Sequence, residues 1–170
     1  EKLWSNEPVD VSKALKRAVD VCAPISQQNG LEVQLTGLNA PVWVNANADR
    51  VCQVFINLIT NAAKYNDAEH PHIRIEMKLR EDELVVDFGD NGPGIAAKDR
   101  STIFEKFSRG RLKQQSSQTG SGLGLAISRE ILANMNGSLE LVPGRSEGAC
   151  FRVALPFVAG LQSRETEPAQ

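Results

Sequence analysis

Residues 51–65 read VCQVFINLITNAAKY and predict the central helix of the fold. Apolar residues recur there at the three- and four-residue spacing of an amphipathic helix: Val51, Val54, Phe55, Leu58, Ile59 and Ala62. Three polar residues, Asn57, Asn61 and Lys64, fall on a second face, within about one turn of one another. The plain interpretation is a solvated outer face, but two glycine clusters further along favour a binding face.

The 170-residue chain has 41% hydrophobic and 24% charged residues, as in a globular protein with one core. Its net charge of −2 argues against a nucleic-acid-binding surface, and no apolar run approaches the roughly 20 residues that span a bilayer. Cys22, Cys52 and Cys150 stand apart within apolar patterns, so we expect reduced core residues in a cytoplasmic protein. With two histidines and no Cys-x-x-Cys pair, a zinc site is not expected.

Hydrophobic periodicity predicts the order α-β-β-α-β-β-loop-α-β-β. Helices are predicted over 10–28 with a kink at Pro24, over 49–66 and over 122–134, with short helical turns within 96–107. The predicted strands cover 31–35, 42–44, 73–79, 84–88, 139–142 and 150–155. Because the strands come mostly in adjacent pairs, we expect an α/β (α+β) two-layer sandwich. Its mixed, largely antiparallel sheet would be covered on one face by three helices.

Two glycine-containing segments carry the chemistry. Residues 90–94 read DNGPG directly after a predicted strand; their glycines would let the backbone approach a ligand, and Asp90 offers an acceptor. An ordinary surface turn is the alternative. Residues 120–125 read GSGLGL and open a helix, where free N–H groups favour phosphate. A flexible hinge is the alternative, and the spacing matches neither a dinucleotide fingerprint nor a P-loop.

Together these features complement a nucleotide. A carboxylate can accept from a base amino group, and a glycine-rich helix start can hold phosphates. A carboxamide oxygen can ligate Mg²⁺, which shares phosphate oxygens and keeps several waters. Lys64 can add a positive charge.

The chain resembles the catalytic, ATP-binding (HATPase) domain of sensor histidine kinases. Four segments look like that family's N, G1, F and G2 boxes, in the family's order: Asn57–Tyr65, Asp90–Ile95, Phe104–Phe107 and Gly120–Leu125. Residues 148–151 with Leu155-Pro156 are similar to its closing strand, and the resemblance covers roughly residues 10–157. It implies the Bergerat ATP-binding fold shared with gyrase, Hsp90 and MutL.

The resemblance also implies residue roles. Asn61 would ligate Mg²⁺, Asn57 would support the phosphates and Asp90 would bond the adenine amino group. The other residues that it places at the ATP site are Lys64, Tyr65, Gly92, Gly94, Ile95, Phe104, Phe107, Arg109, Gly120, Ser121, Gly122, Leu123 and Gly124. Residues 108–121 would form a lid over ATP. Plain core packing is the alternative for the two phenylalanines, and a solvated basic loop for Arg109.

One position indicates transfer rather than hydrolysis. ATP-hydrolysing members of this superfamily resemble one another in carrying a glutamate where this chain has Asn57, and a carboxamide cannot act as a general base. We therefore expect a protein-histidine kinase domain that binds Mg–ATP and passes the γ-phosphoryl group to a histidine. The alternatives are a non-catalytic nucleotide-sensing or docking module and an anti-sigma-factor-type serine kinase of the same fold.

The expected partners follow from the same resemblance. His70 and His72 do not lie in a phospho-acceptor helix pattern, so we expect the acceptor on a separate helical hairpin. Residues 1–9 would be the linker from that hairpin, residues 10–157 the catalytic domain and residues 158–170 a polar, disordered tail. A response regulator would act downstream. We expect a monomeric, cytoplasmic domain that contacts neither membrane nor nucleic acid, within a parent protein that can be membrane-anchored.

Overall fold

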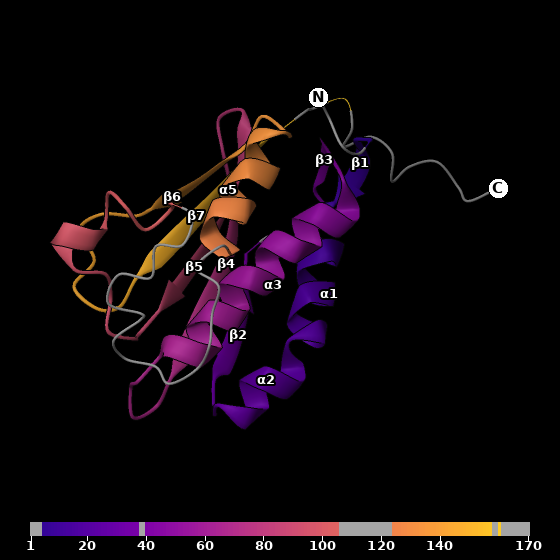
Figure 1. The fold of residues 1–170 in the computed structure, drawn as a ribbon. Coiled ribbons are helices and arrows are strands. Elements are labelled where there is room, and N and C mark those ends of the chain that lie inside the picture. The colour runs from indigo at the N-terminus through magenta and orange to yellow at the C-terminus, as the bar shows by residue number, and fades with distance from the viewer. Residues whose placement is uncertain (1–4, 38–39, 106–123, 158–159, 161–170) are drawn as a thin grey trace.

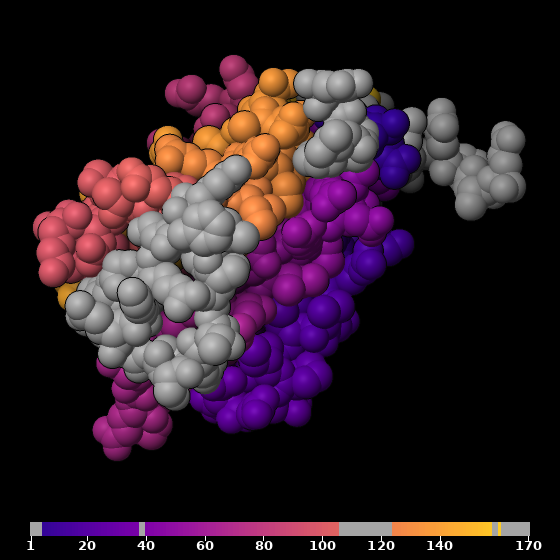
Figure 2. Space-filling view, viewed as in Figure 1, coloured from indigo at the N-terminus to yellow at the C-terminus, as the bar shows by residue number. Residues whose placement is uncertain are grey.

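A computed structural model describes residues 5–37, 40–105, 124–157 and 160. Helices pack on one face of a five-stranded sheet, and a small two-stranded sheet lies beside the start of the central helix (Figure 1). The indigo, magenta and orange helices form most of the coloured surface in Figure 2. This arrangement confirms the predicted two-layer α/β fold.

The central helix is α3, Ala48–Tyr65, which begins and ends one residue before the predicted limits of 49–66. Asn47 caps it, because its side-chain oxygen accepts from the Arg50 amide at 3.1 Å. The apolar face is buried as expected, and the Phe55 ring packs against Phe88 of the sheet with ring centroids 5.5 Å apart. This packing holds the polar face of α3 at one end of the sheet.

The first predicted helix is divided into α1, Val11–Val21, and α2, Ala23–Gln28. Asp10 caps α1 by accepting from the Ser12 amide at 3.1 Å. Pro24 lies in the first turn of α2, where its missing N–H costs nothing, and its ring cannot continue α1. The predicted kink at Pro24 is therefore a break between two helices.

The main sheet has the order β2-β4-β5-β7-β6. Only β2 and β4 are parallel, and the other pairs are antiparallel, which confirms the mixed, largely antiparallel sheet. The strands are β2 Glu32–Thr36, β4 His72–Arg80, β5 Glu83–Asp90, β6 Ser138–Leu141 and β7 Cys150–Pro156.

The sheet face away from the helices is polar. Asp87 lies at its centre, and its two oxygens accept from the Arg152 guanidinium at 2.8 and 3.0 Å, with the Lys78 ammonium 3.1 Å away. Burial raises the pKa of Asp87, but the bonds from Arg152 and Lys78 outweigh it and leave the pKa below its ordinary value. This ion cluster therefore links β4, β5 and β7 across the outer face.

The smaller sheet was not expected. Residues 7–9 were assigned to a linker, yet Glu7–Asp10 forms strand β1, antiparallel to β3, Trp43–Ala46. Pro8 obscured the short strand in the sequence, but the pairing buries Val9 and Val44 against the core. Residues 7–9 thus pair with the fold rather than standing apart from it, while the predicted linker and domain limits stay predictions.

The last elements are a 3₁₀ turn η1, Ala97–Asp99, and helix α5, Gly124–Ala133. Both fall within the predicted helical ranges. All three cysteines are free and buried, as predicted. None of the described helices combines the length and apolarity that crossing a membrane requires. The predicted lid, residues 108–121, and nearly all of the predicted tail lie outside the described residues.

Candidate nucleotide-binding site

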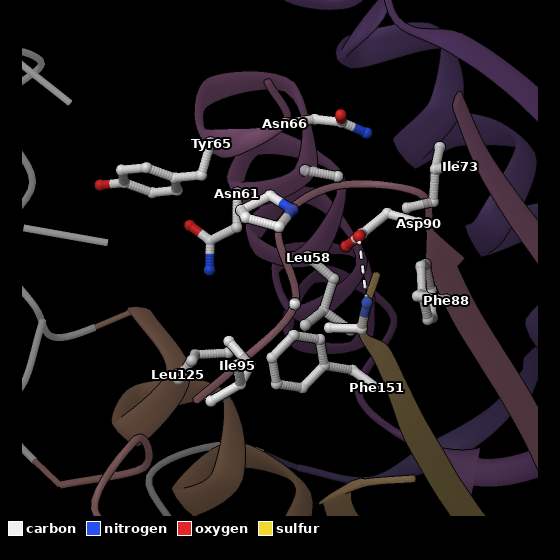
Figure 3. A pocket seen from close by; sticks show the side chains of 14 residues that line it. Leu58, Asn61, Tyr65, Asn66, Ile73, Phe88, Asp90, Ile95, Leu125 and Phe151 are labelled. Carbon is white, nitrogen blue, oxygen red and sulfur yellow. Dashed lines mark hydrogen bonds between the residues drawn. The ribbon is translucent and has the colours of Figure 1, made fainter. Parts of the chain in front are cut away.

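A pocket opens where the polar face of α3 meets the ends of β5 and β7 (Figure 3). Its apolar walls come from five elements, α3, β4, β5, α5 and β7, and from the loop after β5. They include Leu58, Ile73, Phe88, Ile95, Leu125 and Phe151. Polar side chains enter from two places only among the described lining residues: Asn61, Tyr65 and Asn66 from the end of α3, and Asp90 from the end of β5. Such a mostly apolar pocket with a few placed polar groups suits a flat, heteroaromatic ligand.

Asp90 is the charged group among the described residues that line the pocket, and backbone amides hold one of its two carboxylate oxygens. Its Oδ1 accepts from the Gly92 amide at 2.9 Å and from the Ala149 amide at 3.2 Å, the second bond being dashed in Figure 3. Among the described residues, none donates a hydrogen bond to Oδ2. One oxygen is thus fixed by backbone, and the other can accept from a ligand.

Burial raises the pKa of Asp90 above its ordinary value, although the Gly92 and Ala149 amides counteract that effect. The positive charges of Arg145 and His72 lower it further, without reversing the direction. A buried carboxyl group with a raised pKa that lines a pocket is often a functional group.

Glycines bring the backbone close around Asp90. Gly94 has φ +73°, and a Cβ there would lie 2.9 Å from the Gly148 carbonyl oxygen. A Cβ on Gly92 would lie 3.2 Å from Asp90 Oδ1. Both glycines therefore lie where the backbone packs closely around Asp90, and Gly94 lines the pocket, while their predicted approach to a ligand stays a prediction.

The predicted residues of α3 separate into two groups. Asn61 and Tyr65 line the pocket, whereas Lys64 is half-buried and is not part of its lining. Within the described part of the chain, the Asn61 carboxamide makes no hydrogen bond to protein, so its oxygen is available to a ligand or a metal ion. The described residues contain no cluster of three or more His, Cys, Asp or Glu side chains that could hold a metal by itself.

Asn57 contacts α5. Its amide nitrogen donates to the hydroxyl of Ser128 at 3.0 Å and lies 3.5 Å from the carbonyl oxygen of Gly124. Ser128 is fully buried, with 0% of its surface exposed. The Asn57 side chain therefore ties the central helix to the first turns of α5, and Gly124 is that helix's first residue.

Phe104 packs beside the pocket. Its ring meets Phe151 edge to face, with centroids 6.2 Å apart, and the Arg129 guanidinium lies 4.6 Å from its centroid. Phe104 is thus a packing residue one ring removed from the cavity. The other predicted residues of this region lie outside the described residues: Phe107, Arg109, Gly120, Ser121, Gly122 and Leu123.

Several lining residues were not predicted as site residues. Asn66 donates to Asn91 Oδ1 at 2.9 Å, and Asn91 also accepts from the His72 amide at 2.9 Å, so these bonds hold the loop after α3 against the end of β5. Ala149 and Phe151 come from β7 and the turn before it. The sequence signal was present for these two, since they belong to the closing strand noted above, but the bond from Ala149 to Asp90 spans 59 residues.

Comparison with known proteins identifies the class. The family model for histidine kinase-, DNA gyrase B- and HSP90-like ATPases matches residues 46–159, and the chain belongs to this family. The family resemblance inferred from the four boxes is confirmed.

Individual relatives are sensor kinases. Sensor histidine kinase MtrB of Mycobacterium tuberculosis is 34% identical over 156 residues, which are 92% of this chain and 27% of MtrB. The chain thus spans about a quarter of that relative's length. The solved structure of mycobacterial sensor histidine kinase MprB superposes with a TM-score of 0.76 at 25% identity, covering 89% of this chain and 98% of the MprB chain. Full-length ShkA, solved in complex with AMPPNP, gives 0.76 at 26% identity over 92% of this chain and 32% of ShkA.

Proposed function

We propose that this domain binds Mg–ATP and supplies its γ-phosphoryl group to a histidine on a separate helical hairpin, as one part of a two-component sensor kinase. The observation that carries the proposal is the Asp90 carboxylate, which lines an apolar pocket and is held there by two backbone amides that both bond to its Oδ1. The names of the relatives, which are sensor histidine kinases, support histidine as the acceptor.

Adenine would lie between the apolar walls, with its 6-amino group donating to Asp90 Oδ2. Ile95 and Phe151 on the walls offer apolar contact to its ring faces. The close backbone approach at Gly92 and Gly94 leaves room beside the carboxylate. A guanine would place an oxygen where Asp90 needs a donor, so we propose adenine selectivity.

The phosphates would lie toward Asn61 and the start of α5. Asn61 offers a carboxamide oxygen, which fits Mg²⁺ because that ion binds through one or two protein oxygens plus substrate phosphates. When bound, the ion neutralises charge on the phosphates. Lys64, on the same helix, can add a point charge, and the first turn of α5 offers backbone N–H groups.

In the transfer, an imidazole nitrogen of the acceptor histidine attacks the γ-phosphorus while the bond to the bridging oxygen breaks and ADP leaves. The protein's part is to hold the two reactants in line. Asn57 cannot deprotonate water, and its amide is bonded to Ser128, so the site lacks the general base that hydrolysis needs at this position. We therefore propose slow hydrolysis and efficient transfer.

Calorimetric titration with Mg–ADP and a non-hydrolysable ATP analogue tests the proposal. Asp90→Asn should abolish measurable binding, whereas Asp20→Asn, which removes a similar charge from the exposed face of α1, should not change it. Asn61→Ala should keep metal-free binding but lose the gain that Mg²⁺ provides, whereas Asn45→Ala on β3 should keep that gain. A folded parent chain that binds neither nucleotide would refute the proposal and favour a docking module.

The acceptor is tested with an isolated hairpin. Mixed with a helical hairpin from a sensor kinase and labelled ATP, the domain should produce an acid-labile, base-stable phosphoprotein, as phosphohistidine is. Acid-stable label on serine would support the serine-kinase alternative instead. We further propose a response regulator as the downstream partner, because the relatives are sensor kinases.

A further inference from the structure

The outer face of the sheet has a hollow directly behind Asp90. It is separated from the nucleotide pocket by the ends of β5 and β7 and contains the exposed side chain of Arg145. The turn between β6 and β7, residues 142–149, carries this arginine.

The guanidinium of Arg145 lies against the last residues of β5. Its Nη2 is 3.4 Å from the carbonyl oxygen of Asp90, to which it donates. A Cβ on Gly89 would lie 3.1 Å from Nη2 and 3.4 Å from Cζ, so the absence of a side chain at Gly89 is what admits the guanidinium. Arg145 is thus in contact with the backbone that carries the Asp90 carboxylate.

The same turn holds Asp90 at further points. The Asp90 amide donates to the Ala149 carbonyl at 2.9 Å, and the Ala149 amide donates to Asp90 Oδ1 at 3.2 Å. Gly148 passes so close that a Cβ there would overlap the Asp90 carbonyl oxygen. The turn therefore contacts the amide, the carbonyl and the side chain of one residue.

Several neighbouring groups act on the pKa of Asp90, and they do so in opposite directions. Burial raises its pKa, backbone bonds from Gly92 and Ala149 lower it, and the charges of Arg145 and His72 lower it next. Other titratable groups that line the nucleotide pocket or this hollow lie on β4, β5, β7, α3 and the turn itself: Arg74, Glu76, Asp87, Cys150, Tyr65 and Glu147. Arg145 is the charged residue among these neighbours that bonds to Asp90 itself.

We propose that Arg145 is a positioning residue for the nucleotide pocket: from the outer face of the sheet it holds the end of β5 and maintains the negative charge on Asp90 that selects a 6-amino over a 6-oxo purine. This selectivity rests on the proposed function. The effect of the Arg145 charge on Asp90 does not rest on the proposed function, because it is present in the chain without nucleotide.

The first measurement is the titration midpoint of the Asp90 carboxyl, followed by carbon-13 NMR without nucleotide. Arg145→Gln should raise the midpoint by about half a pH unit, as expected for removing one charge at several ångströms near solvent. Arg145→Lys should restore much of the parent value. Arg80→Gln, which removes the same charge at the opposite end of β4, should leave it unchanged.

The second measurement is the ratio of Mg–ADP to Mg–GDP affinity across pH. In Arg145→Gln the loss of ADP affinity on acidification should begin about half a unit higher, so that near the midpoint the ADP preference falls about threefold. A purely structural role would lower both affinities together and leave the pH profile in place.

The outcomes separate the two proposals. Equal Asp90 midpoints in Arg145→Gln and Arg80→Gln overturn the role of Arg145. If Arg145→Gln shifts the Asp90 midpoint but the parent chain binds no adenine nucleotide, the proposed function is overturned and the electrostatic role of Arg145 stands. A shifted midpoint with an unchanged ADP-to-GDP profile overturns the assignment of selectivity to Arg145.

Discussion

Gly144 and Gly148 belong to the same turn and share a left-handed backbone, with φ of +74° and +62°. They differ in the space around them. A side chain on Gly144 would meet nothing within 4 Å, whereas one on Gly148 would overlap the backbone of Asp90. Substitutions at these two positions therefore separate the free-energy cost of a left-handed backbone from the cost of steric overlap with Asp90.

Gly144→Ala should lower the free energy of unfolding by about 1–2 kcal/mol, the usual cost of a left-handed alanine. Gly148→Ala should cost about 2–3 kcal/mol more, because the turn or the end of β5 must move, and it should also lose nucleotide affinity. Urea denaturation and ADP titration of both variants measure these effects. Equal losses in the two would show that contact with Asp90 is unimportant.

Asp90 should lower the stability of the empty domain at neutral pH. Because its folded-state pKa is raised, the stability that it contributes is full below its unfolded pKa and is lost as pH rises through the folded value. Asp90→Asn without nucleotide should therefore melt at or above the parent at pH 7. The difference should shrink as the pH falls toward 4. Thermal melts of both proteins from pH 4 to pH 7 measure this difference in melting temperature. The expectation is contradicted if the variant's advantage over the parent is smaller at pH 7 than at pH 4.

At the scale of helices and strands, the hydrogen bond between Asn57 of α3 and Ser128 of α5 could not be predicted from the sequence and can be tested by substitution. Asn57 was expected to support phosphates, a role that stays a prediction, and the structure adds a bond to Ser128 across 71 residues. Ser128 lies at 0% exposure, where an unpaired hydroxyl or amide is costly.

Ser128→Ala should lower the free energy of unfolding by about 1 kcal/mol, and Asn57→Ala by a similar amount. In the double variant the losses should fail to add, with a coupling of about 1 kcal/mol. Ser101→Ala, at an exposed site, serves as the control with no coupling to Asn57. Additive losses in the first pair would show that the bond contributes nothing.

For the molecule as a whole, the described surface favours a monomer. Its exposed large hydrophobic side chains are Val21, Leu35 and Leu79, on three different elements. The outer face of the sheet carries ion pairs rather than an apolar patch. Sedimentation at micromolar concentration should give a single 18.5 kDa species. A stable dimer would contradict this expectation.

Local patterns determined much of this protein. Hydrophobic periodicity and Pro24 placed the helices and the main strands, because these signals act within a few residues along the chain. The boxes around Asn61 and Asp90 indicated two of the polar residues that line the pocket, since each is placed by the element that carries it, and their roles stay predictions. What the sequence could not show is how distant segments meet.

The tertiary structure alone decided those contacts. It pairs β1 with β3, joins Asn57 to Ser128 and places Arg145 against Asp90 across 55 residues. No short-range pattern marks such partners, because each depends on how the sheet orders its strands and on which side chains then share a surface. The sequence therefore indicated the carboxylate and the carboxamide of the pocket, and the groups that hold the carboxylate appeared only in the folded chain.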